Sequence, residues 1–214
     1  MKTLLLILLV VAVPLIGNAQ GMSIGEKPAV QLASGYAPGD RAESFSLKNV
    51  DGAQVSLDNF SDAKGFIVVF TCNHCPFSVA YEDRIIQLDK TYKSLGYPVI
   101  ALNPNDPQIQ PEDSYDNMKK RAKQKKFSFP YLLDEGGVYA HKYGATKTPH
   151  VYLLQKKADG LSVAYIGAID NNSKSGAEAD QKYLENALKE LIAGKEVSVK
   201  TTKAIGCSIK YSKS

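Results

Sequence analysis

The order of apolar and polar positions predicts strands alternating with helices. Two continuous apolar runs, residues 66–70 (FIVVF) and 98–102 (PVIAL), are typical of strands buried on both faces of a sheet. Between them, apolar residues recur at intervals of three and four as far as Gly96, which predicts an amphipathic helix that ends at a glycine. Strands that alternate with helices in this way indicate an α/β fold.

Shorter patterns extend this sheet on both sides. Alternating residues on either side of Asp51-Gly52 predict a β-hairpin before the first buried run. The later predicted elements are helices over about 112–126, 138–143 and 179–193, and strands over 151–154 and 163–169. A turn at Asp159-Gly160 joins those two strands, so they should form an antiparallel edge of the sheet.

The start of the chain has the pattern of an export signal. Lys2 precedes an apolar run over residues 4–16, and small residues stand at −3 and −1 before a cut between Ala19 and Gln20. A membrane-spanning helix needs about 20 apolar residues, so a membrane anchor is the less favoured alternative. We predict a signal peptide over 1–19. The predicted remainder is a flexible arm over 20–36, a folded domain over 37–194 and a polar tail over 195–214 that carries Cys207.

Composition narrows the class of protein only slightly. The 214 residues are 44% hydrophobic and 22% charged, which fits one globular domain with additions at its ends. A formal net charge of +4 does not indicate a nucleic-acid-binding protein. Three cysteines are too few for a small disulfide-stapled fold.

The candidate chemistry is a C-x-x-C pair, Cys72 and Cys75, directly after the first buried strand. Their spacing at a helix start lets the two sulfurs meet, and the free N–H groups there should lower the pKa of Cys72. A protonated His74 would favour the thiolate further. We therefore predict thiol–disulfide exchange with Cys72 as nucleophile, Cys75 as resolving thiol and His74 as thiolate stabiliser.

Two other interpretations of the pair are open. A zinc site would need two further ligands from Cys207, His74, His141 and His150, none of which completes a second ligand pattern. A purely structural disulfide would close a loop of only four residues, which gives little entropic gain. Cys207 is either a buried bystander between Ile205 and Ile209, or a third thiol that pairs with Cys72 or with a partner.

Taken together, the buried strand, the C-x-x-C and a late Thr148-Pro149 resemble the thioredoxin fold. The resemblance implies a central mixed sheet flanked by helices, with an N-terminal hairpin extension. It also implies that Thr148 and Pro149 form the cis-proline loop, which in that family packs against the cysteine pair and helps to bind substrate. The implied cofactor is none beyond the redox-active disulfide.

More narrowly, the chain resembles the redoxin (AhpC/TSA) branch, which includes peroxiredoxins and the TlpA/ResA reductases. It is similar to a "peroxiredoxin-like" group within that branch over about residues 37–211, with Glu43 as a departure where the branch usually has proline. The matching segments include Gly39-Asp40, Phe45-Ser46-Leu47, Asp51-Gly52, Asn105-Asp106-Pro107, Glu112-Asp113-Ser114, 129–134 and 206–210.

The resemblance leaves the activity to be chosen. In the P-x-x-x-T-x-x-C frame of peroxiredoxins, Cys72 stands at the threonine position and Val68 at the proline position, which disfavours a thiol peroxidase. His74 is placed as in periplasmic disulfide oxidases, whereas the fold resembles reductases fed by a membrane donor. We favour an exported reductase of protein or small-molecule disulfides in the bacterial periplasm. A peroxidase, and a copper- or haem-assembly protein that uses the same thiols, are the alternatives.

Overall fold

The computed structural model describes residues 35–211 of the chain. The predicted signal peptide, all of the predicted arm up to residue 34, and residues 212–214 of the tail lie outside the described residues. Among residues 35–211, no helix has the length and apolar character needed to cross a membrane.

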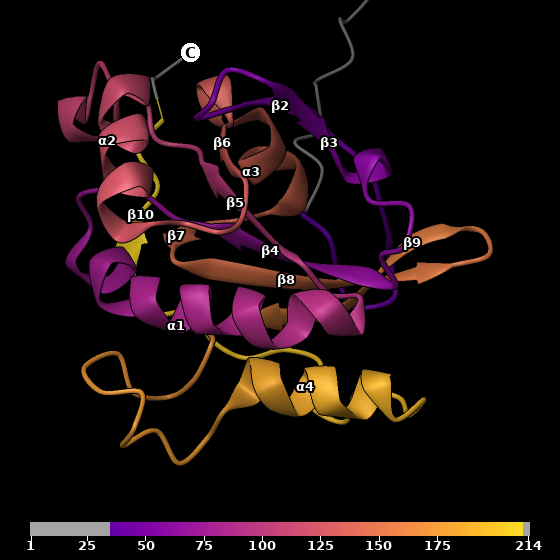
Figure 1. Cartoon of the computed structure of the whole chain (residues 1–214). Coiled ribbons are helices and arrows are strands. Elements are labelled where there is room, and N and C mark those ends of the chain that lie inside the picture. The colour runs from indigo at the N-terminus through magenta and orange to yellow at the C-terminus, as the bar shows by residue number, and fades with distance from the viewer. Residues whose placement is uncertain (1–34, 212–214) are drawn as a thin grey trace, which may run out of the picture. The chain divides into compact units, whose positions relative to one another are not determined.

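An eight-stranded mixed sheet forms the centre of the described domain (Figure 1). Its strand order is β1-β9-β8-β4-β5-β6-β2-β3. The strands are β1 (Arg41–Ala42), β2 (Ser46–Asn49), β3 (Gln54–Ser56), β4 (Gly65–Phe70), β5 (Val99–Asn103), β6 (Tyr131–Leu133), β8 (His150–Lys157) and β9 (Gly160–Gly167). Strand β4 pairs parallel with β5 and antiparallel with β8, so the predicted mixed sheet is confirmed.

Helices cover both faces of this sheet. They are α1 (Pro76–Tyr92), α2 (Tyr115–Lys125), α3 (Val138–Tyr143) and α4 (Tyr183–Ile192), with short 3₁₀ helices at Leu57–Asn59, Lys93–Leu95, Pro111–Asp113 and Glu135–Gly137. The alternation within β4 separates two apolar clusters. Ile67 and Val69 pack with α1, α2 and α4, whereas Phe66, Val68 and Phe70 pack with α3 and the β2–β3 hairpin. Strand β4 is therefore buried on both faces, which explains why its sequence is an uninterrupted apolar run.

Three details differ from the predicted elements. The helix predicted over 112–126 is divided at Ser114, whose extended ψ of 152° separates a 3₁₀ turn from α2. The helix predicted from residue 179 begins only at Tyr183. The β8–β9 hairpin is antiparallel as predicted, but β9 is not the edge of the sheet because β1 pairs with it.

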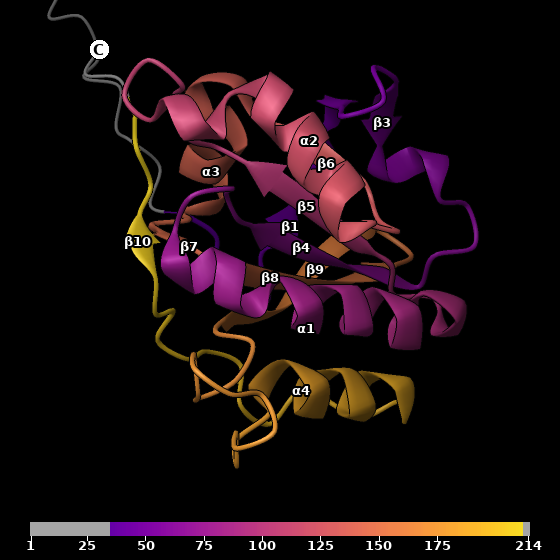
Figure 2. The same cartoon turned by 60° about the vertical axis from the view of Figure 1, so that its left-hand side comes forward.

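A second, two-stranded sheet lies apart from the main one. It pairs β7 (Lys147–Thr148) with β10 (Cys207–Ser208) in antiparallel register. Figure 2 shows β10, in yellow, beside β7 and near the first turn of α1. The predicted tail is therefore not a free polar extension, because part of it is built into the fold beside the C-x-x-C motif.

Candidate active site

The C-x-x-C motif lies where the parallel strands end. Residues 71–75 connect the carboxyl end of β4 to α1, which begins at Pro76 with Cys75 as its N-cap residue. Strands β4, β5 and β6 run parallel, so their carboxyl ends lie together along the same side of the sheet, across the ends of the strands. The loop over 104–113 follows β5 on that side. In open α/β sheets this side is where ligands bind and chemistry takes place.

The three cysteines are paired differently from the prediction. Cys75 forms a disulfide with Cys207, with Cα atoms 6.1 Å apart, and Cys72 is a free thiol. The Cys72–Cys75 pairing is therefore not the one formed in this structure, and Cys207 is neither a bystander nor a partner of Cys72. The reason is the register of β10 on β7, which sets Cys207 opposite Thr148, next to the sulfur of Cys75.

The loop before β8 contacts both sulfurs of the motif. The Thr148-Pro149 peptide bond is cis, as the resemblance implies. The hydroxyl oxygen of Thr148 lies 3.3 Å from the sulfur of Cys72, and its carbonyl oxygen lies 3.2 Å from the sulfur of Cys75. Thr148 therefore joins the two cysteines although 73 residues separate it from Cys75.

The environment of Cys72 disfavours its thiolate. Burial raises the pKa of the Cys72 thiol, and the negative charge of Asp113 raises it further, against weaker lowering by hydrogen bonds between Cys72 and Thr148, the Cys75 backbone and Ser78. The predicted lowering is thus wrong for this state. Cys75, not Cys72, is the N-cap residue of α1, and Cys72 is only 3% exposed.

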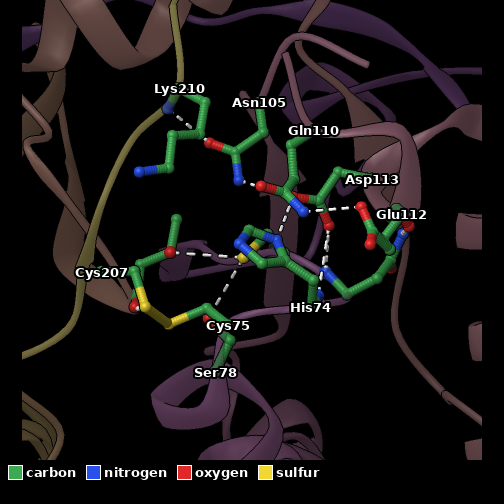
Figure 3. A network of polar contacts seen from close by, with 12 residues as sticks. His74, Cys75, Ser78, Asn105, Gln110, Glu112, Asp113, Cys207 and Lys210 are labelled. Atoms are coloured by element: carbon green, nitrogen blue, oxygen red, sulfur yellow. Dashed lines mark hydrogen bonds and ion pairs between the residues drawn. A yellow bond between two sulfur atoms is a disulfide. The ribbon is translucent and has the colours of Figure 1, made fainter. Parts of the chain in front are cut away.

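His74 has a buried partner that sequence reasoning missed. Its Nδ1 lies 2.5 Å from a carboxylate oxygen of Asp113, a residue with no exposed surface (Figure 3). The other carboxylate oxygen accepts the backbone N–H groups of Asn73, at 2.7 Å, and His74, at 3.2 Å. The Asn105 amide donates to Asp113 at 2.7 Å. Asp113 therefore fixes both the loop between the cysteines and the orientation of the imidazole ring.

Cys72, His74 and Asp113 are arranged like a nucleophile, a base and a carboxylate that orients the base. One ligating atom each of Cys72, His74 and Asp113 lies within 4.8 Å of the other two. Such a set could also contact a metal ion, but the Asp113 oxygens already accept four N–H groups. The disulfide occupies Cys75 and Cys207, so neither the zinc set nor the Cys72–Cys75 copper set is formed in this state.

The other two histidines, His141 and His150, pack against aromatic rings. His150 is buried and has no charged partner among residues 35–211. His141 stacks on Tyr211, with ring centroids 3.8 Å apart. His150 is buried in β8 beside Tyr152. Both therefore pack against tyrosine rings.

Burial of His150 makes stability depend on pH. Burial lowers the pKa of His150 from 6.5 to about 4, so the folded protein keeps it neutral. The unfolded chain gains a proton below about pH 6.5, and the folded chain does not, so stability should fall as the pH drops toward 4. The shift corresponds to about 3 kcal/mol. Urea unfolding at pH 7 and pH 4.5 should show a smaller acid loss for His150→Gln than for the wild type. His141→Gln, at an exposed position, is the control, and an unchanged acid loss in His150→Gln would contradict the prediction.

Other charged residues stabilise the fold outside the motif. Asp170 forms an ion pair with Arg84 of α1 at 2.7 Å. Arg121 of α2 forms an ion pair with the buried Glu82 of α1 at 2.6 Å. These contacts hold α1 against α2 and against the loop before α4.

Comparisons with known proteins identify the family of the chain. The AhpC/TSA family matches residues 38–161. The thiol-disulfide oxidoreductase ResA of Halalkalibacterium halodurans is 25% identical over 125 residues, 58% of this chain and 66% of that protein. ResA of Geobacillus thermodenitrificans is 25% identical over 159 residues, 73% of this chain and 80% of that protein.

Solved structures have the same fold. An uncharacterized conserved protein from Geobacillus kaustophilus is 35% identical, with a TM-score of 0.76 over 83% of this chain and 94% of that one. A putative thiol:disulfide interchange protein DsbE from Chlorobium tepidum, 22% identical with a TM-score of 0.55 over 73% of this chain and 98% of that one, shares the fold. The named relatives support an oxidoreductase. The chain therefore belongs to the AhpC/TSA family and has the thioredoxin-like fold of its redoxin and ResA-type members.

Proposed function

We propose that the protein is an exported thiol–disulfide oxidoreductase that uses Cys72 and Cys75 to reduce disulfides of proteins or small molecules. The observation that carries the proposal is that a free thiol, Cys72, and a disulfide sulfur, Cys75, both lie against Thr148 at the carboxyl end of β4. The similarity to ResA supports the same chemistry.

The exchange proceeds in two displacements. The Cys72 thiolate attacks one sulfur of the substrate disulfide, a mixed disulfide forms, and the other substrate sulfur leaves as a thiolate. The second displacement requires that an external dithiol has first reduced the Cys75–Cys207 disulfide. Cys75, then a free thiolate, attacks the sulfur of Cys72 and releases the second substrate thiolate. The substrate gains two electrons and two protons, and the protein is left with a Cys72–Cys75 disulfide. An external dithiol, for which we propose a membrane donor, restores the pair.

The electrostatics favour the reductase direction. A strongly oxidising pair depends on a stabilised thiolate in the reduced form. In the form with the Cys75–Cys207 disulfide, burial raises the pKa of the Cys72 thiol and the charge of Asp113 raises it further. We expect Asp113 to keep this effect in the reduced form and to balance the charge that a protonated His74 would carry, so the pair should gain little from its thiolate and give up electrons readily.

The reduction potential tests the proposal. Equilibration of the protein with dithiol buffers of known potential, followed by thiol counting, should give a two-electron couple near the thioredoxin value of about −270 mV. A potential near about −120 mV would overturn the direction. If no two-electron couple is found, or thiols disappear in proportion to added peroxide, the proposed function fails.

Export is tested separately. The pattern over residues 1–19 supports it, and the mature chain should begin at Gln20. N-terminal sequencing of protein from the periplasmic fraction of an expressing bacterium should give Gln20-Gly21-Met22. A chain that keeps Met1 and remains in the cytoplasm would contradict export without bearing on the redox chemistry.

A further inference from the structure

The C-terminal segment over 206–210 covers the reactive sulfurs. Strand β10 lies beside β7 (Figure 2). The register of the pair sets Cys207 opposite Thr148 and Ser208 opposite Lys147. In this arrangement Cys75 has no exposed surface and Cys72 is 3% exposed. A thiol enclosed to this extent cannot approach a disulfide of another protein, so this state is closed to the proposed substrates.

The segment fits closely against the loop that it covers. A Cβ atom on Gly206 would lie 2.2 Å from the carbonyl oxygen of Thr148, so any larger residue would displace one of the two strands. The backbone N–H of Lys210 donates to the side-chain oxygen of Asn105 at 2.8 Å. Asn105 also donates to Asp113 (Figure 3), so the tail is joined to the network that orients His74.

We propose that Cys207 is a third redox thiol, and that the segment over 206–210 is a tethered cover that is released when the Cys75–Cys207 disulfide is exchanged. This inference rests on the proposed function. The cover occupies the strand position beside Thr148 that an extended substrate segment would need. The closed form therefore protects Cys72 until the disulfide is opened.

The exchange is internal and needs no oxidant. The Cys72 thiolate attacks the sulfur of Cys75, a Cys72–Cys75 bond forms, and the Cys75–Cys207 bond breaks. Cys207 leaves as a thiolate and takes up a proton, which balances the proton that Cys72 lost. The oxidation level of the protein is unchanged. The sulfurs of Cys72 and Cys75 both lie beside Thr148, so the attack needs only a local movement.

Disulfide mapping tests the exchange directly. The oxidised full-length mature protein is equilibrated in glutathione buffers, blocked with an alkylating agent, digested, and analysed by mass spectrometry. We expect both the Cys75–Cys207 and the Cys72–Cys75 linkage, in a ratio that does not change with the buffer potential because the two forms are isomers. Cys72→Ser should give only Cys75–Cys207. If Cys207 is fully alkylated in the wild type at every potential, the inference is wrong.

A variant of the cover gives an independent test. Gly206→Val should shift the ratio at least tenfold toward Cys72–Cys75, because its side chain would clash with Thr148. Ser208→Ala, in the same segment but without that close approach, is the matched control and should keep the wild-type ratio. Equal ratios for Gly206→Val and Ser208→Ala would show that the segment does not act as a cover.

The rate of reduction separates this inference from the proposed function. Oxidised Cys207→Ser can hold only the Cys72–Cys75 disulfide, so dithiothreitol should reduce it at least tenfold faster than the closed wild type. Equal rates would reject the cover and leave the Cys72–Cys75 chemistry standing. In contrast, disulfide reduction that survives Cys72→Ser would reject the proposed function, whatever the mapping shows.

Discussion

Replacing Cys72 with serine should lower kcat/KM for a disulfide substrate by roughly 10³-fold or more, the range seen when a nucleophile is removed. Cys72 is the free thiol of the motif and contacts Thr148, so no neighbouring sulfur can take its place without rebuilding the site. Serine has nearly the same shape, and its hydroxyl can keep the hydrogen bond to Thr148. The measurement is the reduction of insulin by the protein supplied with a dithiol.

The control for this prediction is a residue away from the sulfurs. Lys120→Ala, at an exposed position of α2, should keep the wild-type kcat/KM. The melting temperature of Cys72→Ser should also stay within a few degrees of the wild type, so that the loss is chemical. Activity within tenfold of the wild type in Cys72→Ser would place the nucleophile elsewhere.

Replacing Asp113 with alanine should lower the free energy of unfolding by about 3 kcal/mol or more, because several donors would lose their shared buried acceptor. The substitution leaves the backbone N–H groups of Asn73 and His74, the Asn105 amide and the His74 ring without their acceptor. Buried donors without acceptors are costly. Urea unfolding at pH 7 measures the loss.

A matched carboxylate lies three residues further along the chain. Asp116 is 76% exposed and pairs with Lys119, so Asp116→Ala should cost less than about 0.5 kcal/mol. A second result separates the charge of Asp113 from its packing. Because that charge raises the pKa of the Cys72 thiol, the less disruptive Asp113→Asn should lower that pKa, which the pH dependence of Cys72 alkylation reports. Equal stability of Asp113→Ala and Asp116→Ala would contradict the assigned network.

The parts of the fold that sequence predicts well are those with a repeated local signal. The runs over 66–70 and 98–102 are the buried strands β4 and β5, and the C-x-x-C lies between strand and helix as its spacing indicated. The cis bond before Pro149 follows from the family resemblance and not from spacing. Strand β10, in contrast, has two residues and no periodicity to identify it.

The parts that sequence missed depend on contacts between distant residues. The spacing of the two cysteines predicts that Cys72 pairs with Cys75. No local pattern indicates that Cys75 is bonded instead to Cys207, which lies 132 residues away. The sequence indicates a stabilising effect of a protonated His74 on the thiolate, but no local pattern links His74 to Asp113, which lies 39 residues later. The pKa of Cys72 was predicted in the wrong direction for the same reason, since burial and a distant carboxylate outweigh its position before α1.

The long sequence separation of the Cys75–Cys207 bond couples the redox state of the protein to its resistance to denaturation. In the chain-entropy description, a crosslink over 132 residues destabilises the unfolded chain by about 5 kcal/mol, against about 2 kcal/mol for the four-residue Cys72–Cys75 ring. By thermodynamic reciprocity, folding must favour the long crosslink by the amount that the crosslink favours folding. Unfolding by heat or denaturant and reduction of the Cys75–Cys207 disulfide are therefore coupled, because each makes the other easier. The closed protein should withstand denaturant alone or a reductant alone better than both together.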